Sequence, residues 1–424
     1  MNDSNYLREV RMQYENYPYP PRDPEDERKR LIPNIIDKLP IINHFCFRGT
    51  QYFGNSFRVL VAGGGTGDSA IFLAEQLKGT NATVTYVDIS TASMDIAKKR
   101  AEVRGLQNIE WHLRSLLELP EMDLAPFDYI NCIGVLHHLE DPVAGLKALR
   151  SVLKEDGAIG LMLYATYGRT PVYQMQDLMR LINTDEPDLQ VKVDNTKKVL
   201  ASLPVNHALK TSETDTDDHI NFGDVGIYDL FLHSQDRSYT VPEVYEYLKT
   251  CNLNPVSFVY KSLLYRPETF ITDKTLLEKI RLMPVMEQQS IAELLCGKFS
   301  RHFLYASPHS NTIADLNNMD NVPFLCGMFS AGQLYDYVRD KRPDDLFTLD
   351  LGFGRISLPV GYYCESIFQN LDGQKSVREL LDIAVAERKV LDPSASREKA
   401  FHEFSSSFQL LNILNQIVLR GKTV

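Results

Sequence analysis

A glycine-rich turn between an apolar strand and a helix constrains the fold of this chain more than any other feature. Residues 57–62 form the apolar run, and Gly63, Gly65 and Gly67 follow it in the pattern Gly-x-Gly-x-Gly, directly before Asp68. Glycine is used where the backbone takes dihedral angles that other residues avoid, or where a ligand approaches the backbone closely. A strand, a glycine-rich turn and a helix in this order predict a ligand site at the carboxyl end of a parallel sheet.

An acidic residue at the end of the next strand indicates that the ligand contains a ribose. Residues 82–87 are predicted as this second strand, and Asp88 ends it about 20 residues after Gly67, a spacing at which an acid can accept hydrogen bonds from both ribose hydroxyls. The dinucleotide fingerprint requires a glycine at the sixth position of the turn, where this chain has Asp68. The pattern therefore favours a nucleoside ligand without phosphates. S-adenosylmethionine, with a carboxylate and an ammonium group, is such a ligand.

Strands and helices continue to alternate up to residue 164, which predicts the fold class. Further strands are expected at 109–113, 127–133 and 158–164, and helices at 68–78, 91–104 and 142–153, with a turn at 156–157. Alternation at these lengths specifies βαβ units and a parallel sheet. We therefore expect an α/β, Rossmann-like domain in which Gly63, Asp88 and Gly134 gather at the carboxyl ends of the strands.

A segment rich in tyrosine and proline precedes this domain. Residues 14–24 contain Tyr17 and Tyr19 among four prolines. Because proline fixes φ and restricts the residue before it, we predict an extended arm here, followed by a helix over residues 25–38. The arm either packs on the domain or covers the bound cofactor or substrate.

The alternation stops after residue 165, and a mixed region follows. We expect helices at 170–183, 194–203 and 241–250, an acidic loop over 212–224, a strand at 299–306 and a linker at 307–312. The acidic loop lacks the glycine and the closing glutamate of a calcium-binding EF-hand loop, so we expect it to be solvated.

The chain from about residue 320 onward reads as a small helix-rich domain. Ser376 is placed to cap the helix that follows it. An apolar stripe at helical spacing is expected to lie in the core of this domain rather than at a cofactor. The stripe consists of Phe401, Phe404, Phe408 and Leu411.

Composition and charge exclude several classes of function. The chain is 44% hydrophobic and 24% charged, as is ordinary for a globular protein, and its net charge of −11 disfavours nucleic acid as the main partner. The six cysteines include no CxxC pair, so we expect reduced thiols and no metal site. No apolar run approaches about 18 residues and the first residues lack a signal-peptide layout, which predicts a cytoplasmic protein without membrane spans.

Residues 57–164 resemble the class I S-adenosylmethionine-dependent methyltransferases. The resemblance rests on the glycine turn, on Asp88 and on the segment 134–142 (Gly-Val-Leu-His-His-Leu-Glu-Asp-Pro). It implies the seven-stranded sheet of that class, with S-adenosylmethionine as the cofactor. The implied cofactor contacts are Gly63, Gly64, Gly65, Thr66, Gly67, Asp68, Asp88, Ile89, Ser115, Leu116, Gly134 and Val135. Two positions depart from the family pattern: Val61 replaces an acid of the first strand, and Arg114 with Ser115 replaces the adenine-contacting acid.

More narrowly, residues 10–265 resemble a bacterial subgroup that includes the rickettsial-type protein lysine methyltransferases. The shared features are Tyr17-Pro-Tyr-Pro, the acid-free first strand, the segment 135–142 and the segment 229–236. The last 100 residues or so resemble small winged-helix, peptide-recognising modules attached to such enzymes. The expected parts are an N-terminal arm with helices (1–55), the cofactor-binding domain (56–165), a helical insert that completes the substrate region (166–310) and a helix-rich accessory domain (311–424).

The candidate catalytic residues are tyrosines and histidines. A sulfonium donor is already activated, so orientation supplies much of the catalysis and no dedicated triad is required. If the acceptor is a lysine, its pKa of about 10.4 must be lowered, and hydroxyls can orient the neutral amine. The tyrosine candidates are Tyr17, Tyr19 and Tyr164. If the acceptor is a hydroxyl, a base is more useful, and the candidates are His137, His138 and His233, for which structural roles stay open.

The sequence therefore predicts a methyltransferase whose acceptor is a protein or peptide side chain, with lysine nitrogen favoured. A small-molecule O- or N-methyltransferase of a biosynthetic pathway is one alternative. A non-catalytic, cofactor-binding interaction protein is another. The expected partners are the methyl acceptor and, in a homodimer, a second copy of the chain.

Overall fold

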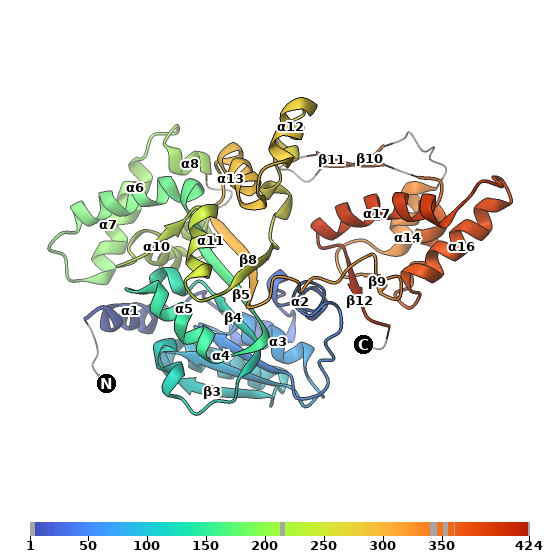
Figure 1. Cartoon of the computed structure of the whole chain (residues 1–424). Helices are drawn as coiled ribbons and strands as arrows, with labels where there is room; N and C mark the ends of the chain where they lie inside the picture. Colours follow the sequence, from blue (N-terminus) through green and yellow to red (C-terminus); the bar gives the residue numbers. More distant parts are fainter. Residues whose placement is uncertain (1–4, 213–216, 340–345, 351–354, 360, 423–424) are drawn as a thin grey trace. The chain divides into compact units, whose positions relative to one another are not determined.

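A computed structural model describes residues 5–212, 217–339, 346–350, 355–359 and 361–422 (Figure 1). The chain divides into two compact units, and each is described by itself. Unit 1 comprises Met1–Asp37, Phe53–Pro255 and Glu293–Pro308, and unit 2 comprises Lys38–Tyr52, Val256–Ala292 and His309–Val424. No helix in the described ranges combines the length and the hydropathy needed to cross a membrane.

A mostly parallel sheet forms the centre of unit 1. Within the described residues its strand order is β3-β2-β1-β4-β5-β8-β7, and the short β6 pairs with β5. Strands β1 to β5 run parallel to their neighbours, whereas β8 is antiparallel to β5. The strands are β1 (Arg58–Ala62), β2 (Thr83–Asp88), β3 (Ile109–Leu113), β4 (Phe127–Ile133), β5 (Leu153–Ala165), β6 (Ser238–Tyr239), β7 (Asn254–Phe258) and β8 (Arg301–Ser307). This order is the predicted α/β, Rossmann-like fold, with β6 added to the seven-strand path.

The order of the strands reverses between β1 and β4, so a crevice opens where their carboxyl ends diverge. The strands that flank it are buried on both faces, as parallel strands covered by helices are. The covering helices have clear sequence signals. Ser90 accepts a hydrogen bond from the backbone of Ser93 at the start of α4 (Thr91–Arg104), and Gly105 ends that helix with φ of 63°.

The other helices that alternate with these strands are α3 (Asp68–Gln76) and α5 (Pro142–Ser151). Gly67 precedes α3 with φ of 101°, and Asp141 caps α5 by accepting hydrogen bonds from the backbone of Val143 and Ala144. These contacts fix where each helix starts, and therefore where the preceding loop leaves the sheet.

The N-terminal segment differs from the prediction. Helix α1 (Asn5–Asn16) includes Tyr14, so the extended arm begins only after it. The helix predicted over residues 25–38 is wrong: short 3-10 turns at Pro24–Arg28 and Ile35–Asp37 replace it. Pro33 lies between them, and proline both removes a backbone donor and disfavours a helical conformation in the residue before it.

Two further predictions are corrected. The turn predicted at 156–157 does not interrupt β5, which runs through these residues. The extra residues of β5 are accommodated by a shift in its register with β4, between Phe127 and Tyr129. The acidic loop at 212–224 is largely helical where it is described, in α9 (Asp218–Asn221) and the start of α10 (Gly223–Phe231). Residues 213–216 of that prediction lie outside the described residues.

A helical cluster forms the middle of unit 1. Its helices are α6 (Thr166–Ile182), α7 (Leu189–Ser202), α8 (Ala208–Ser212), α9, α10 and α11 (Val241–Lys249). Apolar side chains from α6, α7 and α10 pack together, including Val172, Met175, Val193 and Phe231. Helix α9 contacts α10, and residues of both helices line a cavity together with Tyr164 of β5.

Unit 2 contains a helix-rich core, as predicted. Its helices and strands are α2 (Leu39–Cys46), α12 (Lys274–Arg281), β9 (Val322–Leu325), α14 (Ala331–Val338), β10 (Leu346–Asp350), β11 (Arg355–Pro359), α15 (Cys364–Gln369), α16 (Val377–Lys389), α17 (Arg397–Ile413) and β12 (Ile417–Arg420). Helix α13 (Val285–Cys296) begins in unit 2 and ends in unit 1. Strand β9 pairs with β12, and β10 with β11, each antiparallel.

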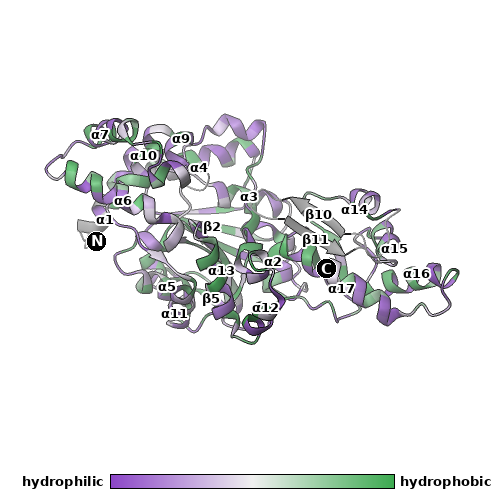
Figure 2. Ribbon diagram, turned by 90° about the horizontal axis from the view of Figure 1, so that it is seen from above, coloured by the Kyte–Doolittle hydropathy of each residue, from purple (hydrophilic) through white to green (hydrophobic). Residues whose placement is uncertain are grey.

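The sequence signals of this region are confirmed. Ser376 caps α16 in a capping box with Glu379. Phe404, Phe408 and Leu411 of α17 are buried in the core, and Phe401 packs against it. Figure 2 shows both hydrophobic and hydrophilic residues on α16, as expected of a helix with one packed face.

Candidate active site

A cavity of about 460 Å³ lies at the carboxyl ends of the unit 1 strands, within the usual range of about 300–1,000 Å³ for small-molecule sites. One side, which we call the glycine-turn wall, is formed by residues of 61–69, 87–93, 114–116 and 131–135. A second group of lining residues, which we call the tyrosine wall, consists of Tyr14, Tyr19, Tyr164, Asp218, Phe222, Asp229 and Arg301.

Most of the predicted site residues line this cavity. They are Tyr19, Gly63, Gly64, Gly65, Asp68, Asp88, Ile89, Ser115, Leu116, Gly134, Val135, His138 and Tyr164. The other predicted residues lie behind these. Thr66 is buried and donates from its hydroxyl to the carbonyl of Pro20 at 2.6 Å, and Gly67 starts α3. Tyr17 stacks on Tyr228 with ring centroids 5.0 Å apart, outside the cavity lining.

The glycines of the turn are required by the protein as well as by any ligand. A Cβ on Gly63 would lie 2.2 Å from a methyl of Val135, and Gly63 has φ of 75°. A Cβ on Gly65 would lie 2.8 Å from the carbonyl oxygen of Tyr19. The turn is therefore packed between the arm and the loop after β4, with its backbone exposed to the cavity only because these side chains are missing.

Asp88 presents its carboxylate to the cavity from the end of β2. The backbone N–H of Gly65 donates to one carboxylate oxygen and that of Ser90 to the other, each at 2.8 Å. Burial raises the pKa of Asp88, and the backbone hydrogen bonds oppose that rise. Because a carboxylate oxygen has more than one lone pair, Asp88 can still accept hydrogen bonds from two ligand hydroxyls.

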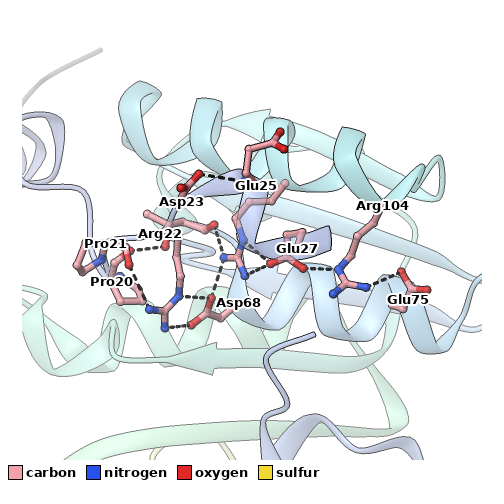
Figure 3. Close-up of polar contacts among 11 residues, drawn as sticks. Pro20, Pro21, Arg22, Asp23, Glu25, Glu27, Asp68, Glu75 and Arg104 are labelled. Carbon is pink, nitrogen blue, oxygen red and sulfur yellow. Dashed lines mark hydrogen bonds and ion pairs between the residues drawn. The ribbon is translucent and has the colours of Figure 1, made fainter. Parts of the chain in front are cut away.

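Asp68 is held by arginines from two different elements (Figure 3). Arg22 of the arm donates from Nε and Nη2 at 2.9 and 2.6 Å, and Arg100 of α4 donates from Nη1 at 2.7 Å. Burial alone would raise the pKa of Asp68, but the two guanidinium groups lower it. The carboxylate is thus a fixed charge that ties the arm to the start of α3.

The same network continues away from the cavity. Arg100 donates to Glu27 at 2.6 Å, and both side chains are almost fully buried. Arg104 also contacts Glu27, and its other end lies 3.7 Å from Glu75 (Figure 3). A buried charge is tolerated only when it is paired, so this chain of ion pairs fixes the arm on α4.

Ser115 lines the cavity at the end of β3. Its hydroxyl accepts from the backbone of Leu117 at 3.2 Å, while Glu118 accepts from the backbone of Ser115 at 3.0 Å. Arg114 pairs with the same Glu118 at 2.9 Å. The hydroxyl proton of Ser115 stays available to a ligand, because capping uses only the acceptor side of the oxygen.

The tyrosine wall contains a buried carboxylate. The Tyr14 hydroxyl lies 3.5 Å from Asp229 and also 3.5 Å from Nε2 of His233. Burial, with a smaller contribution from Asp218, raises the pKa of Asp229 to about 7. Asp229 can therefore change its protonation state near neutral pH or on the arrival of a cation.

A stack of rings supports this wall from behind. The Arg169 guanidinium lies 3.4 Å from the Tyr164 ring centroid, and the opposite contact of Tyr164 is His137, with centroids 3.7 Å apart. His138 stacks on His233 at 3.8 Å. Burial lowers the pKa of His138 to about 4 and lowers that of His137 and His233 as well, so all three rings are neutral at pH 7. His137 and His233 lie outside the cavity lining.

Several residues of the site have no counterpart among the predicted ones. They are Tyr14, Arg22, Asp218, Asp229 and Arg301. Tyr14 and Arg22 lie in the tyrosine- and proline-rich segment 14–24, and Asp229 opens the segment 229–236, so these three had a detectable signal. Arg301 had none, because it reaches the site only through the antiparallel pairing of β8 with β5. In the part of the chain that the structure describes, no group of three or more His, Cys, Asp or Glu side chains is arranged to hold a metal ion.

Comparison with known proteins indicates that the residues around this cavity belong to a methyltransferase domain. Residues 60–159 match a family described as "Methyltransferase domain". An uncharacterized protein of Synechococcus is 29% identical over 299 residues, which cover 70% of this chain and 70% of that protein. The ubiquinone biosynthesis O-methyltransferase of Actinobacillus pleuropneumoniae is 31% identical over 122 residues, which cover 28% of this chain and 48% of that enzyme. The chain therefore spans about half the length of that relative.

Among solved structures, PKMT2 from Rickettsia typhi has a similar fold over most of the chain. The TM-score is 0.62, and the match covers 91% of this chain and 76% of PKMT2 at 14% identity. PKMT2 has also been solved in complex with AdoHcy, the product form of the methyl donor. At this level of identity the likeness establishes a shared fold.

Proposed function

We propose that this chain, which carries a class I S-adenosylmethionine-dependent methyltransferase domain, methylates a protein or peptide side chain, with lysine nitrogen favoured. The methyl donor is S-adenosylmethionine, which supplies a methyl group already activated by its sulfonium. The acceptor is the proposed part, and the observation that carries it is the buried carboxylate of Asp229 among the aromatic rings of the tyrosine wall.

The residues of the glycine-turn wall fit the donor. Asp88 has the remaining lone pairs that a ribose requires, and Ser115 has a free hydroxyl proton for the adenine edge. The backbones of Gly63–Gly65 and of Gly134 and Val135 are open to the cavity and would hold the methionine part. These assignments are proposals for individual residues.

The tyrosine wall suits an amine that arrives as a cation. Tyr14 and Tyr19 line the cavity, and a ring face attracts an ammonium group. Both faces of the Tyr164 ring, by contrast, are already covered by Arg169 and His137. Asp229 and Asp218 add negative charge at the same place. An ammonium group beside Asp229 would lower the raised pKa of this carboxyl, so binding the amine and ionising Asp229 support one another.

The amine must lose its proton before it can attack. At pH 7, deprotonating a lysine of ordinary pKa costs roughly 4.6 kcal/mol. Burial in the cavity and the adjacent sulfonium charge both lower that cost. Asp229, once ionised, is placed to accept the proton, while the Tyr14 hydroxyl at 3.5 Å can donate to it. The remaining requirement is orientation, which the walls of the cavity supply.

A small-molecule acceptor is the second candidate. Met162, Phe222 and Phe303 give the cavity an apolar lining near Tyr164, which suits a small apolar acceptor. A hydroxyl acceptor would gain from a general base, but His138, with a pKa of about 4, is a weak one. This observation favours an amine over a hydroxyl.

A labelling experiment separates the two candidates. The purified protein is incubated with a cell lysate and S-adenosylmethionine carrying a tritiated methyl group, and label is counted in the protein and small-molecule fractions. We expect label in protein, recovered as methyllysine after hydrolysis, and no transfer by Asp88→Ala. Label confined to small molecules would rule out the protein acceptor and favour the second candidate.

A further inference from the structure

We propose that Arg301 binds a carboxylate in this cavity, and that the carboxylate is the one on the methionine part of the methyl donor. Arg301 is the first residue of β8 and pairs in register with Tyr164 at the end of β5. Its side chain lines the cavity beside Phe303 of the same strand. The proposal concerns donor binding and does not depend on the identity of the acceptor.

The charge of Arg301 has no direct counter-ion among the described residues. Its guanidinium forms no hydrogen bond or ion pair with any of them, although it is only partly exposed. Burial is the largest single influence and lowers the pKa of Arg301, but Asp218, Tyr19 and Tyr164 together raise it by more, so the group stays protonated. A charged group with little access to water and no partner is costly, and a bound anion would remove this cost.

The other cations that line the cavity are already engaged. Arg22 donates from Nε and Nη2 to Asp68 and from Nη1 to the carbonyl of Pro21. Arg114 pairs with Glu118 at the opposite end of the glycine-turn wall. Within the described part of the lining, Arg301 is thus the arginine left for a ligand carboxylate, and a guanidinium matches a carboxylate with two parallel hydrogen bonds.

The position of Arg301 relative to the arm supports the donor as the source of the carboxylate. Tyr19 lines the same cavity as Arg301. The carbonyl of Tyr19 accepts a hydrogen bond from the backbone of Thr66 at 3.4 Å, inside the glycine turn. In the strand order β3-β2-β1-β4-β5-β8, Ser115 follows β3 and Arg301 begins β8, so the adenine end of the donor is far from Arg301 and the methionine part is the nearer half.

A carboxylate could also arrive on the acceptor, as in a free amino acid. Arg301 would bind either carboxylate in the same way, so an experiment with two arms distinguishes the two sources. In the donor arm, calorimetry measures the dissociation constants of S-adenosylmethionine and of decarboxylated S-adenosylmethionine for the full-length protein. In the acceptor arm, L-lysine and L-lysinamide are titrated into protein saturated with S-adenosylhomocysteine. Each pair of probes differs in the carboxylate.

We expect the wild-type protein to bind S-adenosylmethionine about 10- to 100-fold more tightly than its decarboxylated form, the usual range for hydrogen bonds to a charged group. Arg301→Met should reduce this ratio to about 1, and Arg301→Lys should keep part of it. Arg150→Met is the matched control, because it removes an arginine that lies outside the cavity lining and is already paired with Glu155, and it should leave the ratio unchanged.

Thermal unfolding of each variant shows that the fold is intact before binding is compared. A lost preference in the acceptor arm alone would support carboxylate binding by Arg301 and assign the carboxylate to the acceptor. If Arg301→Met leaves both preferences as they are in the wild-type protein, the proposal is wrong.

Discussion

The two walls of the cavity are built in different ways. The glycine-turn wall comes from one stretch of sequence, residues 61–135, in which each strand end delivers its residues in chain order. The tyrosine wall brings together Tyr14, Tyr164, Asp229 and Arg301, which are far apart in the sequence. The glycine-turn wall is therefore built from local motifs, whereas the tyrosine wall depends on how the helical insert and β8 fold back onto β5.

Two carboxylates, Asp68 of the glycine-turn wall and Asp229 of the tyrosine wall, differ in whether a cation pairs with them. Asp68 is paired with Arg22 and Arg100, and their charges lower its pKa. Asp229 has no cation as a direct partner among the described residues. Arg169 attracts it only from a longer range, and burial raises the pKa of Asp229 to about 7. A paired carboxylate suits a permanent anchor, and a carboxylate that titrates near pH 7 suits proton transfer. The predictions below test this division of roles.

The largest expected effect is on the anchor of the glycine-turn wall. Arg100→Met leaves Glu27 buried without its main partner and removes one of the two cations on Asp68. Breaking a buried ion pair on one side costs about 3–5 kcal/mol of unfolding free energy. Urea denaturation measures this loss.

The matched control for that variant is Arg150→Met, which breaks the 2.6 Å pair with the exposed Glu155. Exposed pairs contribute about 0–1 kcal/mol, so this control should change stability little. Equal losses in the two variants would show that the arm is not anchored by the buried network.

The next largest effect concerns donor binding. Asp88→Ala removes the proposed acceptor of both ribose hydroxyls, and each hydrogen bond to a charged group contributes about 1.5–3 kcal/mol. We expect the affinity for S-adenosylhomocysteine, measured by calorimetry, to fall about 100-fold or more. Asp95→Ala, an exposed carboxylate on α4, serves as the control. If Asp88→Ala binds S-adenosylhomocysteine as tightly as the wild-type protein does, Asp88 does not bind the ribose.

A third variant separates the two walls directly. Asp229→Asn keeps the shape of the side chain but cannot accept the amine proton. We expect methyl transfer to fall about 100-fold, a typical contribution of a positioned general base. The dissociation constant of S-adenosylhomocysteine should stay within about threefold of the wild-type value, since a residue that acts on the acceptor alone changes turnover and not donor binding. Equal losses in both measurements would place Asp229 with the donor.

The last prediction concerns the pH dependence of stability. The pKa of Asp229 is about 7 in the folded chain and about 4 when unfolded, so the folded state holds this proton more tightly. Its contribution to stability is present at low pH and is lost as pH rises from about 4 to 7. Asp229→Asn should therefore be more stable than the wild-type protein at pH 8 by up to about 4 kcal/mol, three pKa units at about 1.36 kcal/mol each, with little difference at pH 4. Urea denaturation at both values checks the sign, and a stabilising effect at pH 4 alone would contradict it.

Local signals explain which elements the sequence predicts well. The helix over 91–104 and the strands at 109–113 and 127–133 have the expected bounds, because Ser90 caps the helix, Gly105 ends it and the strands are short runs between clear turns. The predicted helix over 25–38 failed because Pro33 outweighs the helical character of its neighbours. The division into parts at 55, 165 and 310 stays a prediction.

The same distinction holds for the site. The glycine turn, Asp88 and the loop after β4 are recognisable because their spacing follows from the βαβ repeat. The sequence placed Asp218 in a solvated loop, whereas it begins helix α9 in the structure. The helix packs on α10, and no local sequence pattern reveals that contact. Arg301 is a single arginine at the start of an antiparallel strand, and only the register of β8 on β5 brings it to the cavity.

The most direct test of the division between a donor wall and an amine-accepting wall is to identify the methylated atom. The protein is incubated with a lysate and S-adenosylmethionine carrying a deuterated methyl group, and mass spectrometry locates the label. The account predicts labelled lysine side chains with the wild-type protein, a strongly reduced amount with Asp229→Asn despite retained donor binding, and none with Asp88→Ala. Label on hydroxyl groups or small molecules, produced equally well by Asp229→Asn, would contradict it.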